Sequence, residues 1–438
     1  MVRFQSIFKK VFLVTSFLFQ IFFISCSKNP SERAEKYLTY WSAANQQEID
    51  LAAIVVEKWN LLHPEFPVRT EPIASGQSSE EVLLAAIAGR TTPDICSNIW
   101  PGVLEQYVEA QVVVLLDTMP GFDSLITSRI PDRLVSGYAS SDGKYYQIPW
   151  KSNPVLFIYN TNYFDVLDIK KVPTTYKEFD NISRKVLELS KTGESPIKWM
   201  HYRNVLPIWW QRLFDFYPFY IAASGGKTLL KDGKVDFDND SAVKVFEFFA
   251  SGYREGFVSK SILQMEDLFI KEKVLADIVG PWRVSHLAKF APHINYKYGP
   301  LPRPDDVTGP PLTYADPKSI VIFKTAPYPE MAWEFVKFMV SEESDRLLLE
   351  IATQLPIRKN LLENETFDEF FEKNPELTLF AEQVTYAVGV DKTIYLQEIF
   401  DIISQEFEAA CIHHVKTPSK GIKDAAKRVR LLLARDRT

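Results

Sequence analysis

The 438-residue sequence lacks the motifs that mark several common classes of enzyme. It contains neither the HExxH motif of zinc peptidases nor the G-x-S-x-G turn that carries a nucleophilic serine. Residues 226–228 resemble the end of a phosphate-binding loop, but the first glycine of that loop would stand at position 221, which is Ile221. Acidic pairs are common, yet none is marked by sequence as the carboxylate pair of a glycosidase. We therefore predict no catalytic residue and no enzyme activity.

Histidine is scarce, with six residues in the whole chain. Only His413 and His414 are adjacent, and they lie in a segment that we expect to be helical. Neighbouring side chains on a helix point about 100° apart, so they cannot share a metal ion as an i,i+4 pair does. The sequence therefore predicts no metal site and no cofactor.

Cysteine is scarcer still, with three residues in the chain. Cys96 and Cys411 are more than 300 residues apart, and in an exported protein they could form a disulfide. Cys96, however, stands in a short apolar segment that reads as a buried strand. We predict two free, buried thiols, with a disulfide as the alternative.

Positive charge is outnumbered by negative charge. Without residues 1–25 the chain has 47 Lys and Arg against 56 Asp and Glu, a formal net charge of −9. Phosphate backbones are bound by clustered cations, so this balance argues against a nucleic-acid partner. The segment Lys416–Arg437 is locally basic, but its apolar spacing predicts a packed helix with a solvated basic face.

A long apolar run occurs near the amino terminus, from Val11 to Ile24. Its 14 residues are fewer than the roughly 20 that span a bilayer, and basic residues precede it, so we predict an export signal over residues 1–25. Ser25 followed by Cys26 is typical of lipoprotein processing, in which the cysteine becomes the acylated amino terminus. Residues 26–36 would then be a tether to the membrane. The alternative is an ordinary signal peptide followed by a chance cysteine.

The length of the chain exceeds that of one ordinary hydrophobic core, which predicts two lobes. Helix-like and strand-like segments alternate early in the chain, over residues 51–62, 68–73, 80–88 and 94–99. Residues 155–160 form a continuous apolar run, as expected of a strand that is buried on both faces. The predicted fold class is α/β.

Several short motifs in this order resemble family 1 extracellular solute-binding proteins, the sugar receptors of ABC importers, of which maltose-binding protein is the type. The motifs lie at residues 59–64 (N-x-x-H-P), 84–94, 142–164, 173–178, 279–282 (V-G-P-W), 329–338 (P-x-x-A-W-E-F-x-K-F) and 354–358. In the last of these motifs Gln354 stands where the family pattern has glycine. The resemblance covers residues 37–365.

The resemblance implies a two-lobe periplasmic-binding-protein type II fold with a hinge and a ligand cleft between the lobes. The N-terminal lobe is expected to comprise residues 37–153 and 300–340, and the C-terminal lobe residues 154–299 and 341–438. The chain would cross between lobes near 150–156, near 296–301 and again near 340. Hinge closure on the ligand would create the surface that the ABC permease subunits recognise, and the protein would act as a monomer.

The sequence is rich in aromatic residues, which make up 13% of the chain and include nine tryptophans. A sugar ring offers an apolar face to an aromatic platform and a fringe of hydroxyl groups to amides and carboxylates. Strand ends in an open α/β sheet are the usual place for such groups. The candidate ligand-binding residues are Trp41, Asn45, Asn98, Trp100, Trp150, Trp209, Trp282, Asp316 and Arg358.

Each candidate also has an ordinary structural interpretation. The tryptophans could belong to the core, and Trp150 could cover the crossing between lobes. Trp209 and Trp210 cannot both face the cleft from one helix, so one of them is expected in the core. The polar candidates could be helix caps, turn residues or surface residues.

The predicted function is that of a lipid-anchored sugar receptor, exported to the periplasm or the cell surface. Two alternatives remain open. A receptor for a polyamine would need several carboxylates around its aromatic residues, and a receptor for iron would need paired tyrosines with a histidine. An exported enzyme acting on glycosides would need two facing carboxylates, one with a raised pKa.

Overall fold

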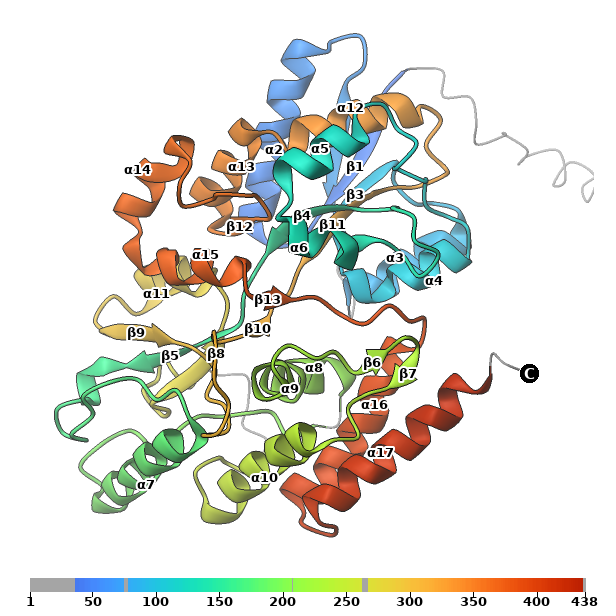
Figure 1. Ribbon diagram of the computed structural model, residues 1–438. Coiled ribbons are helices and arrows are strands. Elements are labelled where there is room, and N and C mark those ends of the chain that lie inside the picture. The colour runs from blue at the N-terminus through green and yellow to red at the C-terminus, as the bar shows by residue number, and fades with distance from the viewer. Residues whose placement is uncertain (1–35, 75–77, 207, 262–266, 436–438) are drawn as a thin grey trace, which may run out of the picture.

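The computed structural model describes residues 36–74, 78–206, 208–261 and 267–435, which form two α/β lobes joined by extended segments (Figure 1). The predicted export signal, Cys26 and all but the last residue of the tether lie outside the described residues. Within the described part, none of the helices combines the length and apolar character that crossing a bilayer requires.

Lobe 1 contains a six-stranded sheet with strand order β12-β4-β11-β3-β1-β2. β1 pairs in parallel with β2 and β3, whereas β11 runs antiparallel to β3 and β4. The sheet therefore joins early and late parts of the chain. Its strands are β1 (Leu38–Ser42), β2 (Val68–Pro72), β3 (Ile95–Ile99), β4 (Ile148–Ser152), β11 (Lys318–Ile322) and β12 (Leu355–Pro356).

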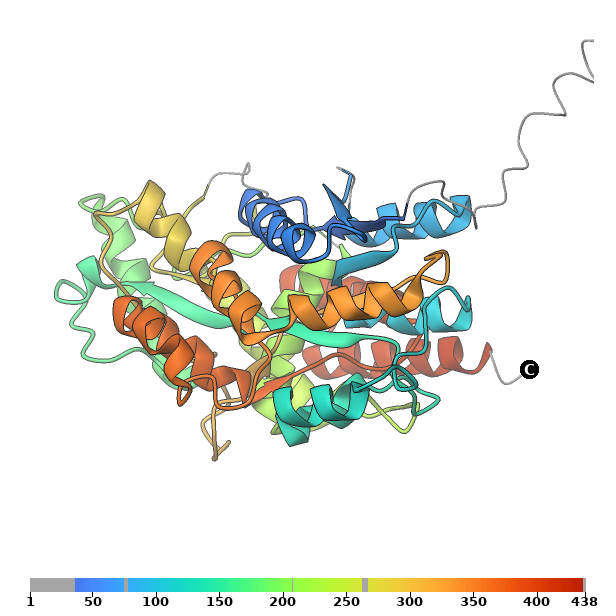
Figure 2. The ribbon, with the colours of Figure 1, turned by 90° about the horizontal axis from the view of Figure 1, so that it is seen from above.

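Helices cover both faces of this sheet because its strands alternate between two apolar cores. Ile95 and Ile320 belong to one core, whereas their neighbours Cys96 and Val321 belong to the other. The first core is covered by α2, α5 and α12, which lie at the top of Figure 1 and toward the viewer in Figure 2, and the second by α3 and α4. The helices of lobe 1 are α2 (Gln46–Leu62), α3 (Ser79–Gly89), α4 (Leu104–Glu109), α5 (Phe122–Arg129), α6 (Asp132–Val135), α12 (Pro329–Met339) and α13 (Glu342–Leu347).

Lobe 2 is built on a three-stranded antiparallel sheet with β5 at its centre. Every residue of β5 (Leu156–Asn160) is buried, as the apolar run predicted. Its neighbours are β8 (Ala276–Val279) and β9 (Tyr296–Gly299), and a short hairpin joins β6 (Leu230–Lys231) to β7 (Lys234–Val235). The helices of lobe 2 are α7 (Tyr176–Thr192), α8 (Trp209–Asp215), α9 (Tyr217–Ser224), α10 (Asp240–Glu255), α11 (Arg283–Phe290), α14 (Glu365–Lys373), α15 (Thr378–Val384), α16 (Leu396–Phe407) and α17 (Pro418–Leu433).

The carboxyl-terminal helices pack onto lobe 2, where α17 lies beside α10 and α16 packs against α8 and α17 (Figure 1). The apolar positions predicted to face the protein in α17 are all buried: Ile422, Ala426, Val429 and Leu432. The prediction of a packed helix with a solvated basic face is confirmed.

The chain passes between the lobes in extended segments. It leaves lobe 1 after β4 and enters lobe 2 at β5, then returns between β9 and β11 through β10 (Thr313–Tyr314), which pairs with β13 (Ala387–Val388). The third passage lies further along the chain than the predicted one near 340. β12 pairs with β4, and Leu347 and Ile357 lie in the core of lobe 1, so residues up to about 357 belong to this lobe rather than to lobe 2.

Cys96 and Cys411 are both buried and both free. The Cys411 thiol donates to the carbonyl oxygen of Phe246 within lobe 2, at 3.4 Å, whereas Cys96 lies on β3 in lobe 1. The prediction of two buried thiols is confirmed, and the disulfide alternative is wrong.

Candidate functional site

A cavity of about 190 Å³, here called the tryptophan cavity, lies where the crossing segments meet lobe 2. Asn153 and Val155 contribute from the first crossing, Asp316 from the second, and α8 and the end of β8 form the rest of the wall. The lining residues are Asn153, Val155, Arg203, Trp210, Gln211, Phe214, Ile278, Val279, Gly280, Trp282 and Asp316.

Two half-exposed indole rings give this cavity its aromatic character. Trp282 is 45% exposed at the start of α11, and Trp210 is 44% exposed on α8. Both rings line the same cavity, where a bound molecule could cover them. A Cβ atom at Gly280 would lie 2.8 Å from Trp282 Nε1, so the glycine before the proline leaves room for the ring. Trp282 thus lies in the wall of a cavity, and its predicted contact with a ligand stays a prediction.

Trp209 and Trp210 have the opposite roles to those predicted. Trp209 is partly buried and its ring lies against that of Trp100, with 5.3 Å between ring centroids. Trp210, one position further along α8, lines the cavity. The prediction that only one of the pair faces the cavity agrees with the structure, but the residue chosen was the wrong one.

Trp100 joins the two lobes through a buried contact. It is 2% exposed, and its Nε1 donates to the hydroxyl of Tyr314 at 2.8 Å. A Cβ atom at Gly102 would overlap the Trp100 ring, so this packing requires glycine there. The structure therefore places Trp100 and Trp209 in an aromatic contact between lobes, not in the cavity wall.

Asp316 supplies a carboxylate to the tryptophan cavity. Its backbone has a left-handed φ of 37°, which few residues other than glycine adopt and asparagine and aspartate tolerate best. Lys318 lies 3.6 Å from Asp316 Oδ1, and both side chains are partly exposed. The left-handed turn places Asp316 in the wall of the tryptophan cavity.

Arg203 and Gln211 were missed by the sequence analysis. Both line the cavity, and both bind Asp215, a fully buried carboxylate on α8: the Arg203 Nε donates to it, and so does the Gln211 amide at 3.3 Å. Asp215 and Asp277 raise the pKa of Arg203 although burial alone would lower it, so this guanidinium stays charged. Only the aromatic density of residues 199–220 pointed to this part of the chain.

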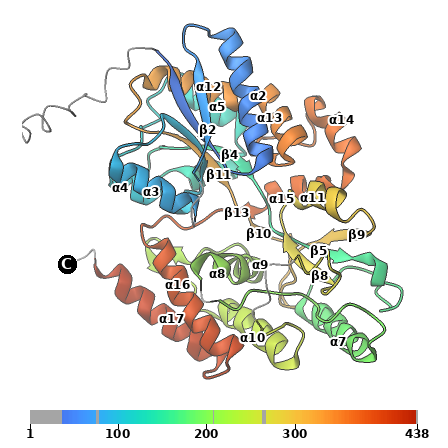
Figure 3. The same ribbon diagram turned by 180° about the vertical axis from the view of Figure 1, so that it is seen from behind.

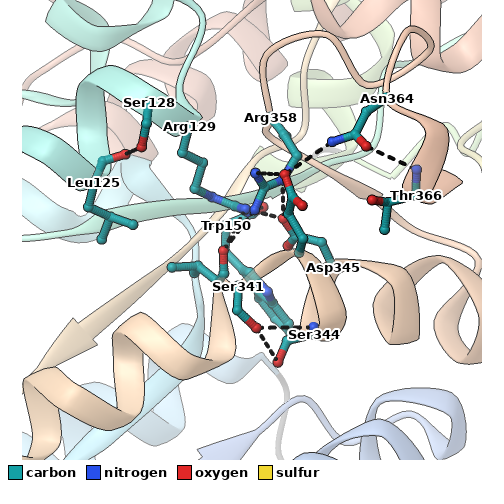
Figure 4. Close-up of polar contacts among 12 residues, drawn as sticks. Leu125, Ser128, Arg129, Trp150, Ser341, Ser344, Asp345, Arg358, Asn364 and Thr366 are labelled. Atoms are coloured by element: carbon teal, nitrogen blue, oxygen red, sulfur yellow. Dashed lines mark hydrogen bonds and ion pairs between the residues drawn. The ribbon is translucent and has the colours of Figure 1, made fainter.

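Arg358 lies in lobe 1 and does not reach the cavity. Its Nε donates to Asp345 Oδ2 at 2.7 Å, and the guanidinium of Arg129 binds the same buried carboxylate (Figure 4). Arg129 also donates to the carbonyl oxygen of Trp150 at 3.0 Å. Trp150 is buried in the core of lobe 1. This ion cluster holds residues 340–358 against lobe 1, which explains why the third crossing comes late.

The remaining candidates lie outside the cavity lining. Trp41 is partly buried against the core that α3 and α4 cover. Asn45 caps α2, because its Oδ1 accepts from the backbone N–H of Glu48 at 3.0 Å. The Asn98 amide donates to Ser79 Oγ at 3.2 Å. The capping interpretation therefore holds for Asn45.

A second, larger cavity of about 750 Å³, here called the rear cavity, lies on the other side of the crossing segments. Ser152 lines it while Asn153 lines the tryptophan cavity, and Ala315 and Pro317 line it on either side of Asp316. This alternation is that of extended chain, whose successive side chains point to opposite faces. β13, which lines the rear cavity, lies toward the viewer in Figure 1, and α11, which begins beside the tryptophan cavity, lies toward the viewer in Figure 3. Tyr138 is the one aromatic residue in the described lining of the rear cavity.

Metal chemistry has no visible support within the residues that the structure describes, where no group of three or more His, Cys, Asp or Glu side chains is placed to hold an ion. The tryptophan cavity thus offers aromatic faces, two acceptor side chains and a charged guanidinium. Aromatic faces beside a few polar groups are typical of small-molecule binding sites.

Known proteins of two kinds are similar to this chain. A candidate binding protein of Brucella abortus is 23% identical over 320 residues, which cover 71% of this chain and 74% of that protein. An uncharacterized protein of Listeria monocytogenes superposes with a TM-score of 0.79 at 26% identity, covering 91% of this chain and 100% of that one. The cyclic alpha-maltosyl-1,6-maltose binding protein of Arthrobacter globiformis superposes with a TM-score of 0.77 at 18% identity, covering 91% and 99%.

These superpositions confirm the predicted two-lobe periplasmic-binding-protein fold. A sequence profile described as bacterial extracellular solute-binding protein matches residues 55–379, most of the chain. The motifs, the two lobes and this match agree, and the chain belongs to the bacterial extracellular solute-binding proteins.

Proposed function

We propose that the protein is the substrate-binding component of an ABC importer and that it captures a sugar or oligosaccharide between its lobes. The observation that carries the proposal is the pair of half-exposed rings, Trp210 and Trp282, in one cavity with the acceptors Asn153 and Asp316. Indole faces suit the C–H face of a sugar ring, and the acceptors suit its hydroxyl groups. The Arthrobacter relative, named for a cyclic maltosyl-maltose, supports the same class of ligand.

The proposed mechanism is closure about the crossing segments. Asn153 and Asp316 lie on those segments, and Trp210 and Trp282 lie on lobe 2, so a molecule in the cavity contacts both the hinge and one lobe. Closure brings lobe 1 over the same molecule and adds contacts that exist only in the closed state. A ligand with more contacts in one state shifts the population toward it. The permease subunits would then recognise the closed form of a monomeric receptor.

We further propose that the protein is exported, cleaved before Cys26 and acylated there. The basic residues, the apolar run and the Ser25-Cys26 pair support this step. More than one acyl chain gives stable anchoring, so the receptor would stay at the membrane surface where the importer lies. Mass spectrometry of the membrane fraction tests it, because a lipid-modified peptide beginning at Cys26 is expected and an unmodified Cys26 would refute it.

A thermal-shift screen tests the ligand class. The chain from Ser27 onward is heated with glucose, maltose, maltotriose, spermidine and divalent metal ions in separate samples. A molecule that binds the native state alone raises the melting temperature by mass action. A rise with a saccharide supports the proposal, and a rise only with spermidine or with a metal ion would refute the sugar assignment.

A further inference from the structure

One polar atom in the wall of the tryptophan cavity lacks a hydrogen bond. The side chain of Asn153 is 7% exposed, and its Oδ1 accepts from no residue that the structure describes. The backbone of Asn153 is held in place, because its N–H donates to the carbonyl oxygen of Ala315 at 2.8 Å. A buried amide oxygen without a donor is costly, so its presence beside a cavity points to a donor on a bound molecule.

A buried ion pair lies behind this side chain in lobe 1. Lys151 Nζ is 2.5 Å from Glu48 Oε1, and both side chains are almost fully buried. The same carboxylate oxygen accepts from Gln354 Nε2 at 2.9 Å and from Asn45 Nδ2 at 3.0 Å. Burial alone would raise the pKa of Glu48, but the ammonium of Lys151 and the hydrogen bonds from Asn45 and Gln354 together outweigh burial and lower it. Glu48 is therefore an ionised acceptor.

The charge on Glu48 determines the direction of the next two amides. An ionised carboxylate only accepts hydrogen bonds, so Gln354 must turn its NH2 group toward Glu48 and its Oε1 the other way. That oxygen lies 3.5 Å from Asn153 Nδ2, and an amide oxygen also only accepts. Asn153 must therefore turn its NH2 group toward Gln354. Its Oδ1 is the atom left without a partner, on a side chain that lines the tryptophan cavity.

We propose that the buried Lys151–Glu48 pair acts through Gln354 to hold Asn153 with its carbonyl oxygen toward the ligand. Gln354 and Glu48 are positioning residues here, and Asn153 is the contact residue. This inference rests on the proposed function for the identity of the ligand, although the orientation of Asn153 does not depend on it. Gln354 stands where the family pattern has glycine, which carries no side chain to make this link.

The orientation of Asn153 selects the ligand group that can occupy this wall. Asn153 Oδ1 and the Asp316 carboxylate are both acceptors, and both lie on the crossing segments. A hydroxyl group can donate to them, whereas a carboxylate or phosphate on the ligand would meet acceptors only. The ligand that we propose therefore presents hydroxyl donors to the crossing segments, with its apolar face toward Trp210 or Trp282, while the charged Arg203 lies elsewhere in the lining.

Isothermal titration of maltotriose, and of the other neutral saccharides in the screen, tests the contact. Replacing the amide by an isosteric apolar side chain in Gln354→Met should raise Kd about 10-fold, and Asn153→Leu should do the same, since each variant loses the proposed hydrogen bond between Asn153 Oδ1 and the ligand. The double variant should be little worse than either single variant, because both act on one contact. An unchanged Kd in Gln354→Met, or fully additive losses, would overturn the proposal.

A matched control separates positioning from general damage. Gln383 on α15 is also a buried glutamine with an unpartnered Oε1, and it lines neither cavity. Gln383→Met should change stability in urea to a similar extent and leave Kd unchanged. If Asn153→Leu does not fold by circular dichroism, Asn153→Ser takes its place.

A measurement without ligand distinguishes the two proposals. The side-chain amide signal of Asn153 in a ¹⁵N–¹H spectrum should shift in Gln354→Met and stay in place in Gln383→Met. An unshifted signal in Gln354→Met overturns the inference about Asn153 even if a saccharide binds. If no saccharide binds but the signal shifts, the sugar assignment fails and the orientation of Asn153 stands.

Discussion

Replacing Trp282 by alanine should weaken saccharide binding strongly and leave the fold almost unchanged. A large aromatic side chain removes up to about 250 Å² from water when fully covered, so the exposed 45% of Trp282 offers about 110 Å² to a ligand. At about 25 cal/mol per Å², complete cover contributes about 2.8 kcal/mol and half cover about 1.4 kcal/mol. The expected rise in Kd is therefore about 10- to 100-fold.

Titration calorimetry measures this loss, and Phe290→Ala is the matched control. Phe290 is 55% exposed and lies on the same helix α11, but it does not line the tryptophan cavity. Its removal should leave Kd unchanged, and both variants should melt near the temperature of the unmodified protein. A Kd that Trp282→Ala leaves unchanged would refute the assignment of this ring as a sugar platform.

Three further changes test other parts of the structure. In Gly280→Ala the added Cβ would lie 2.8 Å from Trp282 Nε1, so the ring must move and Kd should rise while the melting temperature changes little. Asp345→Asn removes the buried charge that the guanidinium groups of Arg129 and Arg358 share, and urea denaturation should show a loss of about 3–5 kcal/mol. Burial lowers the pKa of His201 to about 3, so stability that is complete above the ordinary pKa of 6.5 is lost as the pH falls from 6.5 toward 3. In His201→Phe the urea midpoint should fall less with decreasing pH over that range than in the unmodified protein. An equally steep fall in both proteins would contradict this account.

The sequence was sufficient for features that depend on short-range patterns. The apolar run of β5, the buried face of α17 and the glycine and proline before Trp282 are all local, and the structure agrees with each. The family resemblance then supplied the two-lobe arrangement, which no local pattern specifies. Trp282 was chosen from the match of residues 279–282 to the family pattern, and its role in ligand binding stays a prediction.

The errors concern side chains whose environment is set by distant partners. Trp100 follows a strand and could have faced a ligand. Its indole N–H instead donates to the hydroxyl of Tyr314, more than 200 residues away in the sequence, in a buried contact. Arg358 is similarly held by Asp345 and Arg129. Which of Trp209 and Trp210 lines the cavity depends on the contact that Trp209 makes with Trp100 of lobe 1. The position of the third crossing is set by the pairing of β12, a strand of two residues whose pattern is too short to be detected in the sequence.

The two buried thiols make this protein convenient for measuring its own closure. After removal of residues 1–26, Cys96 and Cys411 are the only cysteines left in the chain. Burial raises the pKa of Cys96 to about 12 and that of Cys411 well above its ordinary value, so neither forms the reactive thiolate at neutral pH. Cysteines introduced on the surfaces of the two lobes can therefore carry spin labels or fluorophores without any background from native thiols. Distances between the lobes could then be followed during titration in the otherwise unaltered sequence.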